Sequence, residues 1–338
     1  MTQGSLPAPP RGRKFWPLVL RIVVAIALFA WLGTHLDWKA IARTMSTIDP
    51  KWAIAALLVL WAGLGIAVVR WHTILKALGS DFHWGETVRV FGGGLFLSLF
   101  LPTSIGGDVY RLARVGRSGF GTGRAGVSLL VERGIGLLAL LLLVAPVVYA
   151  NKRTQDLVPL ALGLGLAAVS VLFLFGLWGR PVTTFLARRI PILEPVLGHG
   201  TWEAIVRTAP TVFVLSLLNH MATIGSNYLL ARALHVSLGF WDAMALIPLV
   251  ILAGQLPIAP GGLGVREAAF VYFLGRAGIG HEPALAVGLA WLAALYLTGG
   301  IGALLFLADR RKEPTKAGLD LETIPLAPSG VDTPSNPT

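Results

Sequence analysis

Two short tracts combine helix-breaking residues with an arginine, and each follows an apolar run. The first reads LPTSIGGDVYR, residues 101–111, and the second reads LPIAPGGLGVR, residues 256–266. They share the pattern L-P-x-x-x-G-G-x-x-x-R without a gap. Proline interrupts helical hydrogen bonding, and paired glycines allow a tight reversal of the chain. Arginine can hold a phosphate through a planar fork of hydrogen bonds, so each tract joins a helix break to a potential anion-binding group.

Charged side chains in and near these tracts are the candidate binding residues. Arg111 and Arg266 end the tracts, while Glu132–Arg133 and Arg266–Glu267 place opposite charges side by side in the chain. Charges at membrane depth are costly, so they are normally paired and face the bundle interior or a cavity. Asp108 lies one helical turn before Arg111 and is expected to tether that arginine rather than to bind a cation.

Two interpretations of these residues remain open. The arginines either hold a phosphate group, or each Glu–Arg pair locks one helix to another, with the arginine extending to the lipid head groups. Asn219, His220 and Asn227 lie in the apolar segment 209–231 and either line a pathway or hydrogen-bond to neighbouring helices. The predicted substrate-binding set is Arg111, Arg133, Arg266, Asp108, Glu132, Glu267, Asn219 and His220.

No catalytic residue, metal site or cofactor site is predicted. The seven histidines show neither H-x-x-H nor H-E-x-x-H spacing, and the chain has no cysteine. Histidine pairs at those spacings and cysteine thiolates are the usual sequence marks of a zinc site. The lack of cysteine also excludes disulfides and thiol chemistry.

The composition identifies a polytopic membrane protein. Hydrophobic residues make up 55% of the 338 positions and charged residues only 13%. A soluble domain of this size cannot keep so much apolar surface away from water. The net charge of +11 comes from short basic tracts beside apolar segments, which membrane topology and anionic head groups explain without nucleic acid.

Six segments are long and apolar enough to cross a bilayer, which takes ~20 helical residues. They are residues 15–33, 52–69, 126–149, 157–178, 209–231 and 284–308. The two tracts are predicted to break two further helices that enter the membrane and return. The expected helix-breaking residues are Pro102, Gly106, Gly107, Pro257, Pro260, Gly261 and Gly262.

The distribution of lysine and arginine favours this re-entrant interpretation. Arginines at 111, 114, 117 and 124 follow the first tract closely, and DRRK follows the last span. If residues 90–107 crossed completely, both groups would lie outside the cell, against the preference of basic residues for the cytoplasm. If the segment enters and returns, every strongly basic tract is cytoplasmic. An ordinary cytoplasmic loop between two spans remains the alternative.

The predicted fold is therefore an all-α polytopic membrane protein with two inverted repeats, about six full spans and two re-entrant broken hairpins. The repeat units lie near residues 52–150 and 207–308, because each tract has one span before it and one after it. We expect a cytoplasmic N-terminal segment at 1–14, a membrane domain at 15–308 and a disordered cytoplasmic tail at 309–338. Many transporters build a central site from inverted repeats with discontinuous helices.

Three motifs resemble the transmembrane region of the lysylphosphatidylglycerol synthase family, the flippase part of the multiple peptide resistance factor. They are LPTSIGGDVYRLARVGRSG, VERGIGLL and PIAPGGLGVREAAF, within a resemblance that covers roughly residues 15–308. The resemblance implies a lipid translocase fold in the bacterial inner membrane. The family's cytosolic aminoacyltransferase domain has no counterpart in these residues, so aminoacyl-lipid synthesis by this chain alone is not expected.

The expected function is accordingly a transporter-like one rather than an enzymatic one. The substrate would be an anionic phospholipid or a polyprenyl-phosphate-linked lipid, with a hopanoid lipid as a further option. An integral membrane enzyme or a non-catalytic accessory subunit of a lipid, hopanoid or glycolipid pathway is the alternative. Expected partners are membrane lipids and lipid-biosynthetic enzymes, with no nucleic acid.

Overall fold

A computed structural model describes residues 36–100, 106–150, 152–171, 181, 199–255, 262 and 264–311. These residues are almost entirely helical, and none of them lies in a β-strand. The helices of the first part are α2 (Trp38–Ser46), α3 (Pro50–Ala77), α4 (Trp84–Phe100), α5 (Gly106–Val115) and α6 (Thr122–Ala150). The later helices are α9 (His199–Ala233), α10 (Phe240–Gln255), α11 (Val265–Arg276) and α12 (His281–Arg311).

Five helices of the described part are long and apolar enough to span a membrane: Pro50–Ala77, Thr122–Ala150, Thr154–Val171, Gly200–Ala233 and His281–Asp309. They correspond to five of the six predicted spans, and the sixth, residues 15–33, lies outside the described residues. The chain is therefore an all-α, multi-pass membrane protein. The last helix continues past residue 308 to Arg311, and the tail from 312 onward lies outside the described residues.

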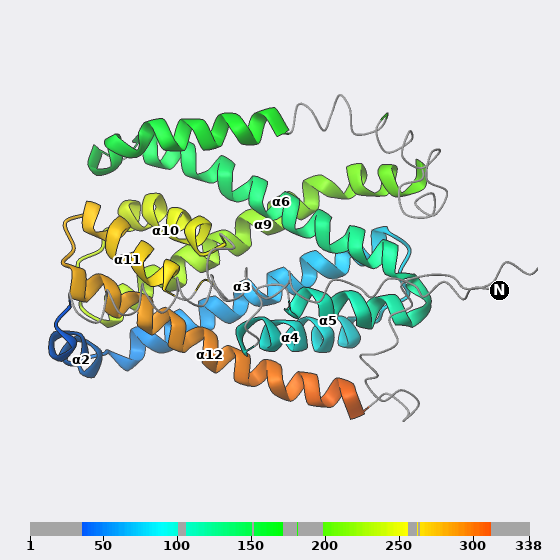
Figure 1. Ribbon diagram of the computed structural model, residues 1–338, viewed down its shortest axis with the longest axis horizontal. Coiled ribbons are helices and arrows are strands. Elements are labelled where there is room, and N and C mark those ends of the chain that lie inside the picture. Colours follow the sequence, from blue (N-terminus) through cyan, green and yellow to red (C-terminus); the bar gives the residue numbers. More distant parts are fainter. Residues whose placement is uncertain are drawn as a thin grey trace, which may run out of the picture.

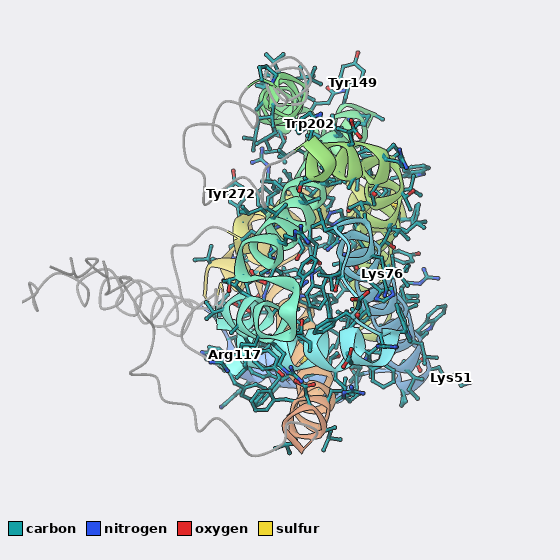
Figure 2. The ribbon with its side chains drawn as sticks, turned by 90° about the vertical axis from the view of Figure 1, so that its right-hand side faces the viewer. Lys51, Lys76, Arg117, Tyr149, Trp202 and Tyr272 are labelled. Atoms are coloured by element: carbon teal, nitrogen blue, oxygen red, sulfur yellow. The ribbon has the colours of Figure 1, made fainter. Side chains whose placement is uncertain are left out.

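Large apolar side chains on the outside of the bundle fit this assignment. Leu130 and Leu304 keep 73% and 68% of their surface exposed, which is expected where hydrocarbon chains surround a helix. Tyr149 and Tyr272 also lie at the outside of the bundle in Figure 2. Polar side chains inside the bundle are consequently the ones that need an explanation.

The helices pair in a regular way around the centre. Helices α3 and α9 cross the middle of the bundle side by side, α4 packs along α12, and α10 packs on α6 (Figure 1). The short helices α4 and α5 lie in one half of the bundle, and α10 and α11 lie in the other (Figure 1). The start of α3 is tied to the end of α9, because Asp49 N–H donates to the Ala233 carbonyl at 2.8 Å.

Each of the two tracts begins after one short helix and ends inside the next. Helix α4 ends at Phe100 and α5 begins at Gly106, while α10 ends at Gln255 and α11 begins at Val265. Four of the predicted helix-breaking residues, Pro102, Pro257, Pro260 and Gly261, lie outside the described residues. Gly106 and Gly107 are the first two residues of α5, and the interruption of the helix by the prolines stays a prediction.

The second glycine of each tract packs directly on the preceding short helix. A Cβ atom added at Gly107 would collide with the Gly94 carbonyl and the Ser98 hydroxyl of α4. A Cβ atom at Gly262 would lie 2.6 Å from the Gly254 carbonyl of α10, and Gly262 has a φ of +72°, which glycine adopts without strain. Glycine is therefore required where Gly107 packs on α4 and where Gly262 packs on α10.

Candidate functional site

Residues beside both helix breaks line one cavity of about 640 Å³. Ser98, Leu99 and Asp108 reach it from the first break, and Gly254, Gln255 and Gly262 reach it from the second. The other lining residues come from α3, α4, α5, α6, α9 and α12: Leu60, Leu64, Ala67, Arg70, Phe91, Gly94, Leu95, Arg111, Glu132, Arg133, Asn219, Thr223, Trp291 and Leu295.

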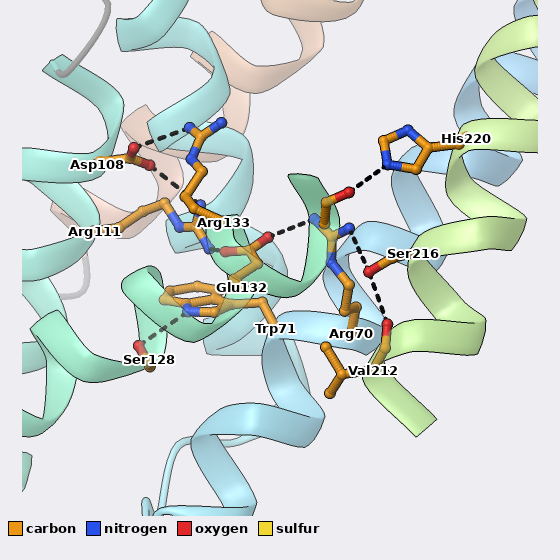
Figure 3. A network of polar contacts seen from close by, with 11 residues as sticks. Arg70, Trp71, Asp108, Arg111, Ser128, Glu132, Arg133, Val212, Ser216 and His220 are labelled. Carbon is orange, nitrogen blue, oxygen red and sulfur yellow. Dashed lines mark hydrogen bonds and ion pairs between the residues drawn. The ribbon is translucent and has the colours of Figure 1, made fainter. Parts of the chain in front are cut away.

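Glu132 of α6 is the centre of a buried ionic network (Figure 3). Its Oε1 accepts a hydrogen bond from Arg70 Nη2 at 3.0 Å, and its Oε2 accepts a short one from Arg111 Nη2. Arg70 also donates through Nη1 to the Ser216 hydroxyl of α9 at 3.2 Å. One carboxylate thus joins α3, α5, α6 and, through Arg70, α9. Removing one member of such a buried set leaves an uncompensated charge and is strongly destabilising.

Arg111 is held rigidly by aromatic rings as well as by charge. Its guanidinium carbon lies 4.0 Å from the centre of the Trp71 ring and 4.8 Å from that of Phe91. The Trp71 indole in turn donates to the Ser128 hydroxyl at 3.3 Å (Figure 3). The aliphatic stem of Arg111 lies against Gly94, where a side chain would collide with it. Cation–π contacts of a desolvated arginine are favourable, so this guanidinium has a fixed position.

Arg133 is different because most of its side chain remains open. It donates through Nη2 to Asp108 Oδ2 at 2.9 Å, while Arg111 Nη1 reaches Asp108 Oδ1 at 3.4 Å. The Arg133 side chain is 58% exposed, against 7% for Arg111 and 11% for Arg70. Glu132 and Arg133 are neighbours in the chain but bond to different partners. Of these three arginines, Arg133 has the most donor capacity left for a ligand.

The second tract holds its charges away from the cavity. Glu267 is completely buried, accepts from Gly264 N–H at 2.7 Å, and accepts from Arg266 Nε and Nη2 at 3.3 and 3.1 Å. This arrangement closes the first turn of α11 as a capping interaction. Among the described residues of this tract, Gly262 lines the cavity, whereas Arg266 and Glu267 do not. The two arginines that the sequence motif equates therefore have different surroundings.

The polar residues of α9 also have separate surroundings. Asn219 lines the cavity, together with Thr223 one turn later. His220 is buried, and its Nε2 lies 2.9 Å from the Gly136 carbonyl of α6 (Figure 3). Asn227 donates through its side-chain amide to the Thr223 carbonyl at 2.9 Å. Asn219 is thus placed to meet a ligand, and His220 is placed to join two helices.

Arg70 is the site residue that the sequence analysis missed. It follows the apolar run 52–69 directly, at the point where that predicted span ends. The sequence nevertheless indicates that the helix continues past Arg70, because apolar residues keep helical spacing beyond it at Trp71, Ile74, Leu75 and Leu78. Helix α3 indeed continues to Ala77, and Arg70 lies within its buried face.

A second ionic cluster lies at the end of α12. Asp309 is buried and accepts from the Tyr110 hydroxyl at 2.9 Å and from Arg114 Nε at 2.7 Å, both on α5. Arg89 of α4 places its Nε 3.7 Å from the same carboxylate. Glycines along the contact allow α4 and α12 to approach closely, since Gly302 lies against the Gly92 carbonyl. The cluster fixes both short helices of the first break to α12.

Comparison with known proteins matches residues 18–302 to the family model described as the lysylphosphatidylglycerol synthase TM region. The chain is also similar to a protein named glycosyltransferase AglD from Haloferax volcanii, with 22% identity over 361 aligned residues. That alignment covers 90% of this chain but 57% of the relative, so the chain spans little more than half the length of that protein. The family match covers most of the chain and includes both tracts and the buried ionic network. This chain therefore belongs to the family of the lysylphosphatidylglycerol synthase transmembrane region.

Proposed function

We propose that this chain translocates a lipid with an anionic head group across the bacterial inner membrane and that the cavity is the binding site. The observation that carries the proposal is the convergence of both helix breaks and three arginines on one cavity of about 640 Å³. Substrate sites at interrupted helices between repeats are characteristic of secondary transporters. The negative charge of an anionic phospholipid or a polyprenyl-phosphate-linked lipid matches the three arginines that line the cavity.

The order and pairing of the helices support two units of opposite orientation. Each unit has a long helix, two short helices around the break and a second long helix. Contacts between the units are reciprocal, because α4 packs on α12 and α10 packs on α6, while α3 and α9 pack on each other. In this proposal the α4–α5 hairpin enters from the cytoplasm, the α10–α11 hairpin enters from outside, and both termini are cytoplasmic.

Cysteine accessibility tests this orientation because the native chain has no cysteine. Ser118 follows α5 and Ser237 precedes α10, and both are exposed. A Ser118→Cys variant should react with an impermeant maleimide only from the cytoplasmic side, and Ser237→Cys only from the outer side. Labelling of both positions from the same side would contradict the inverted arrangement.

Within the proposed site, Arg133 contacts the lipid phosphate and the Glu132 network keeps the wall in place. Arg133 offers open donors, whereas Arg70 and Arg111 are engaged on both terminal nitrogens. Arginine binds phosphate through two parallel hydrogen bonds, which lysine cannot reproduce. Loss of one charge-assisted bond of about 1.5–3 kcal/mol corresponds to a roughly tenfold to hundredfold loss of affinity.

A vesicle assay tests the proposal directly. The purified chain is reconstituted into vesicles with trace fluorescent phosphatidylglycerol, and dithionite reports the fraction of label that reaches the outer leaflet. We expect transport above protein-free vesicles and a strong reduction with Arg133→Lys. Arg117→Lys is the matched control, because Arg117 is exposed in the connection after α5. If the chain moves neither phosphatidylglycerol nor, in parallel vesicles, a labelled polyprenyl phosphate, the proposal is overturned.

A membrane enzyme that transfers a sugar from or to a lipid is the second candidate. Similarity over 90% of this chain to a protein named a glycosyltransferase favours it. The same vesicles distinguish the two candidates, because a translocase changes the leaflet of the lipid whereas an enzyme changes its mass. A non-catalytic accessory subunit would do neither in the absence of other proteins.

A further inference from the structure

We infer that the apolar chains of the lipid leave the cavity between α3 and α12, and that the hydrogen bond between Trp61 and Thr298 closes this exit. The inference rests on the proposed function and gives a route to the part of the lipid that the arginines do not bind. Three features carry it: an apolar part of the cavity wall, an exposed tryptophan in the middle of α3, and a hydrogen bond that joins the two helices beside that wall.

Part of the cavity wall is apolar and belongs to α3 and α12. Leu60 and Leu64 line the cavity from α3, and Trp291 and Leu295 line it from α12. Arg70 lines the same cavity further along α3. At a rise of about 1.5 Å per residue, Leu64 and Arg70 are about 9 Å apart along the helix axis. The phosphate of a phospholipid is separated from the start of its acyl chains by a similar length. A head group at the arginines can therefore place the start of its apolar chains at the leucines.

Trp61 lies beside this apolar wall at the surface of the bundle. It is in the middle of α3, three residues before Leu64, and residues three apart are neighbours on one side of a helix. Trp61 keeps 40% of its surface exposed, and Leu58, one turn earlier, is also exposed. Tryptophan in membrane proteins is enriched at the two interfaces with water. An exposed tryptophan in the middle of a span therefore calls for a specific explanation.

The explanation is a hydrogen bond to α12. The Trp61 indole Nε1–H donates to the Thr298 hydroxyl at 3.1 Å, and that hydroxyl donates to the Ala294 carbonyl at 2.7 Å. Thr298 lies three residues after Leu295, which lines the cavity, and the neighbouring Leu297 is exposed. The bond thus joins the two helices where each has a cavity-lining residue one turn away. Hydrocarbon offers no acceptor to the indole N–H, so the bond favours the closed form of this contact, the α3–α12 seam.

Other contacts of the same two helices are packed more closely. A Cβ atom at Gly63 of α3 would lie 2.8 Å from Ala222 Cβ of α9, and one at Gly302 of α12 would lie 2.5 Å from the Gly92 carbonyl of α4. At the α3–α12 seam, by contrast, an indole ring and its hydrogen bond connect the helices. One neutral hydrogen bond shifts an equilibrium only roughly two- to tenfold. The seam therefore opens more easily than the two glycine contacts.

Distance measurements across the seam test the inference without requiring transport. Nitroxide labels on Leu58→Cys and Leu297→Cys report the separation of α3 and α12 in nanodiscs, because both positions are exposed and the native chain has no cysteine. Trp61→Phe removes the donor and Thr298→Val removes the acceptor, and both keep an apolar side chain of similar size. We expect each variant to raise the ratio of open to closed seam roughly two- to tenfold. The double variant should add little, because both changes act on one bond.

Trp241→Phe is the matched control, because Trp241 is also exposed at the surface of the bundle but belongs to α10. It should leave the separation of α3 and α12 unchanged. If Trp61→Phe and Thr298→Val give the same distance distribution as this control, the bond does not close the seam and the inference is wrong.

A reversible crosslink then asks whether the lipid uses the seam. Trp61→Cys and Thr298→Cys are combined in one chain and joined by a short, reducible bis-methanethiosulfonate. The crosslinked chain should move fluorescent phosphatidylglycerol about tenfold more slowly than the same chain after reduction, because the seam can no longer open. Equal rates before and after reduction would show that the lipid takes another route. A wild-type chain that moves no lipid would instead refute the proposed function, and the distance measurements would then decide whether the seam opens.

Discussion

Replacing Glu132 by glutamine tests whether the buried ionic network holds the bundle together. Glu132 is 3% exposed, and its two oxygens accept hydrogen bonds from Arg70 and Arg111. Glutamine keeps the shape of the side chain but removes the charge between the two guanidinium groups. Both arginines then remain buried with one fewer charged partner each. We therefore expect Glu132→Gln to destabilise the folded protein rather than to change the ligand contact alone.

The expected loss of folding free energy follows from the two hydrogen bonds whose acceptor is no longer charged. At about 1.5–3 kcal/mol for each charge-assisted hydrogen bond, the loss is about 3–6 kcal/mol. Measured losses from breaking a buried pair by removing one partner, about 3–5 kcal/mol, agree with this range. Since whole domains are stable by only about 5–15 kcal/mol, the variant should lose a large part of its folding free energy.

The assay is thermal unfolding of the detergent-solubilised protein, followed by size-exclusion chromatography of the fraction that remains folded. Glu203→Gln is the matched control, because Glu203 lies on α9 with an exposed side chain. Removing one of the two stranded arginines as well, in Glu132→Gln with Arg70→Gln, should recover part of the lost stability. If Glu132→Gln melts at the same temperature as Glu203→Gln, the network contributes nothing to folding and our reasoning is wrong.

Five further substitutions test other parts of the structure. Gly107→Ala should lower the melting temperature and abolish transport, because the added methyl group meets the backbone of α4, whereas normal melting would disprove this close packing. Glu267→Gln should destabilise the protein by about 1–3 kcal/mol through loss of the cap on α11. Arg266→Lys should leave lipid binding intact, and weaker binding of phosphatidylglycerol by this variant would place Arg266 in the site. Asp309→Asn should increase protease cleavage between α4 and α5, since Tyr110 and Arg114 lose a charged acceptor; unchanged cleavage would exclude a clamping role. Asp108→Asn should tighten phosphatidylglycerol binding in nanodiscs several-fold, and weaker binding would show that the carboxylate supports the site.

The membrane spans were predictable because hydrocarbon imposes a simple requirement on length and polarity. The five described spans contain or overlap the apolar segments that the sequence shows. Proline and paired glycines do not continue a helix, so the sequence also predicts breaks after α4 and α10, in segments that lie outside the described residues. Both kinds of signal are local, so they survive without knowledge of the tertiary structure.

The partners of the charged residues were not predictable, because they are set by packing between distant segments. Arg70 and Glu132 are separated by 62 positions in the sequence and belong to different helices. Glu132 and Arg133 are adjacent, yet neighbouring positions on a helix point about 100° apart and reach different partners. Arg111 and Arg266 occupy the same position in the motif, but only Arg111 lines the cavity. A shared motif therefore predicts a shared backbone break and not a shared role for its arginine.

The position of Asp108 explains how an anion site can be both selective and reversible. This carboxylate accepts from Arg133 and Arg111, so a lipid phosphate that binds Arg133 would compete with it. Because the Asp108–Arg133 bond is lost when the phosphate binds, the net binding free energy is smaller than that of the new phosphate–Arg133 contact alone. A translocase must release its lipid on the far side of the membrane. A site that binds the lipid tightly enough to take it up, but not so tightly that it cannot leave, meets that requirement. Arg111 does not need to move in this exchange, because Trp71, Phe91 and Glu132 hold it. On the proposed function, the fixed arginines maintain the positive wall while the Asp108–Arg133 pair opens and closes with each lipid.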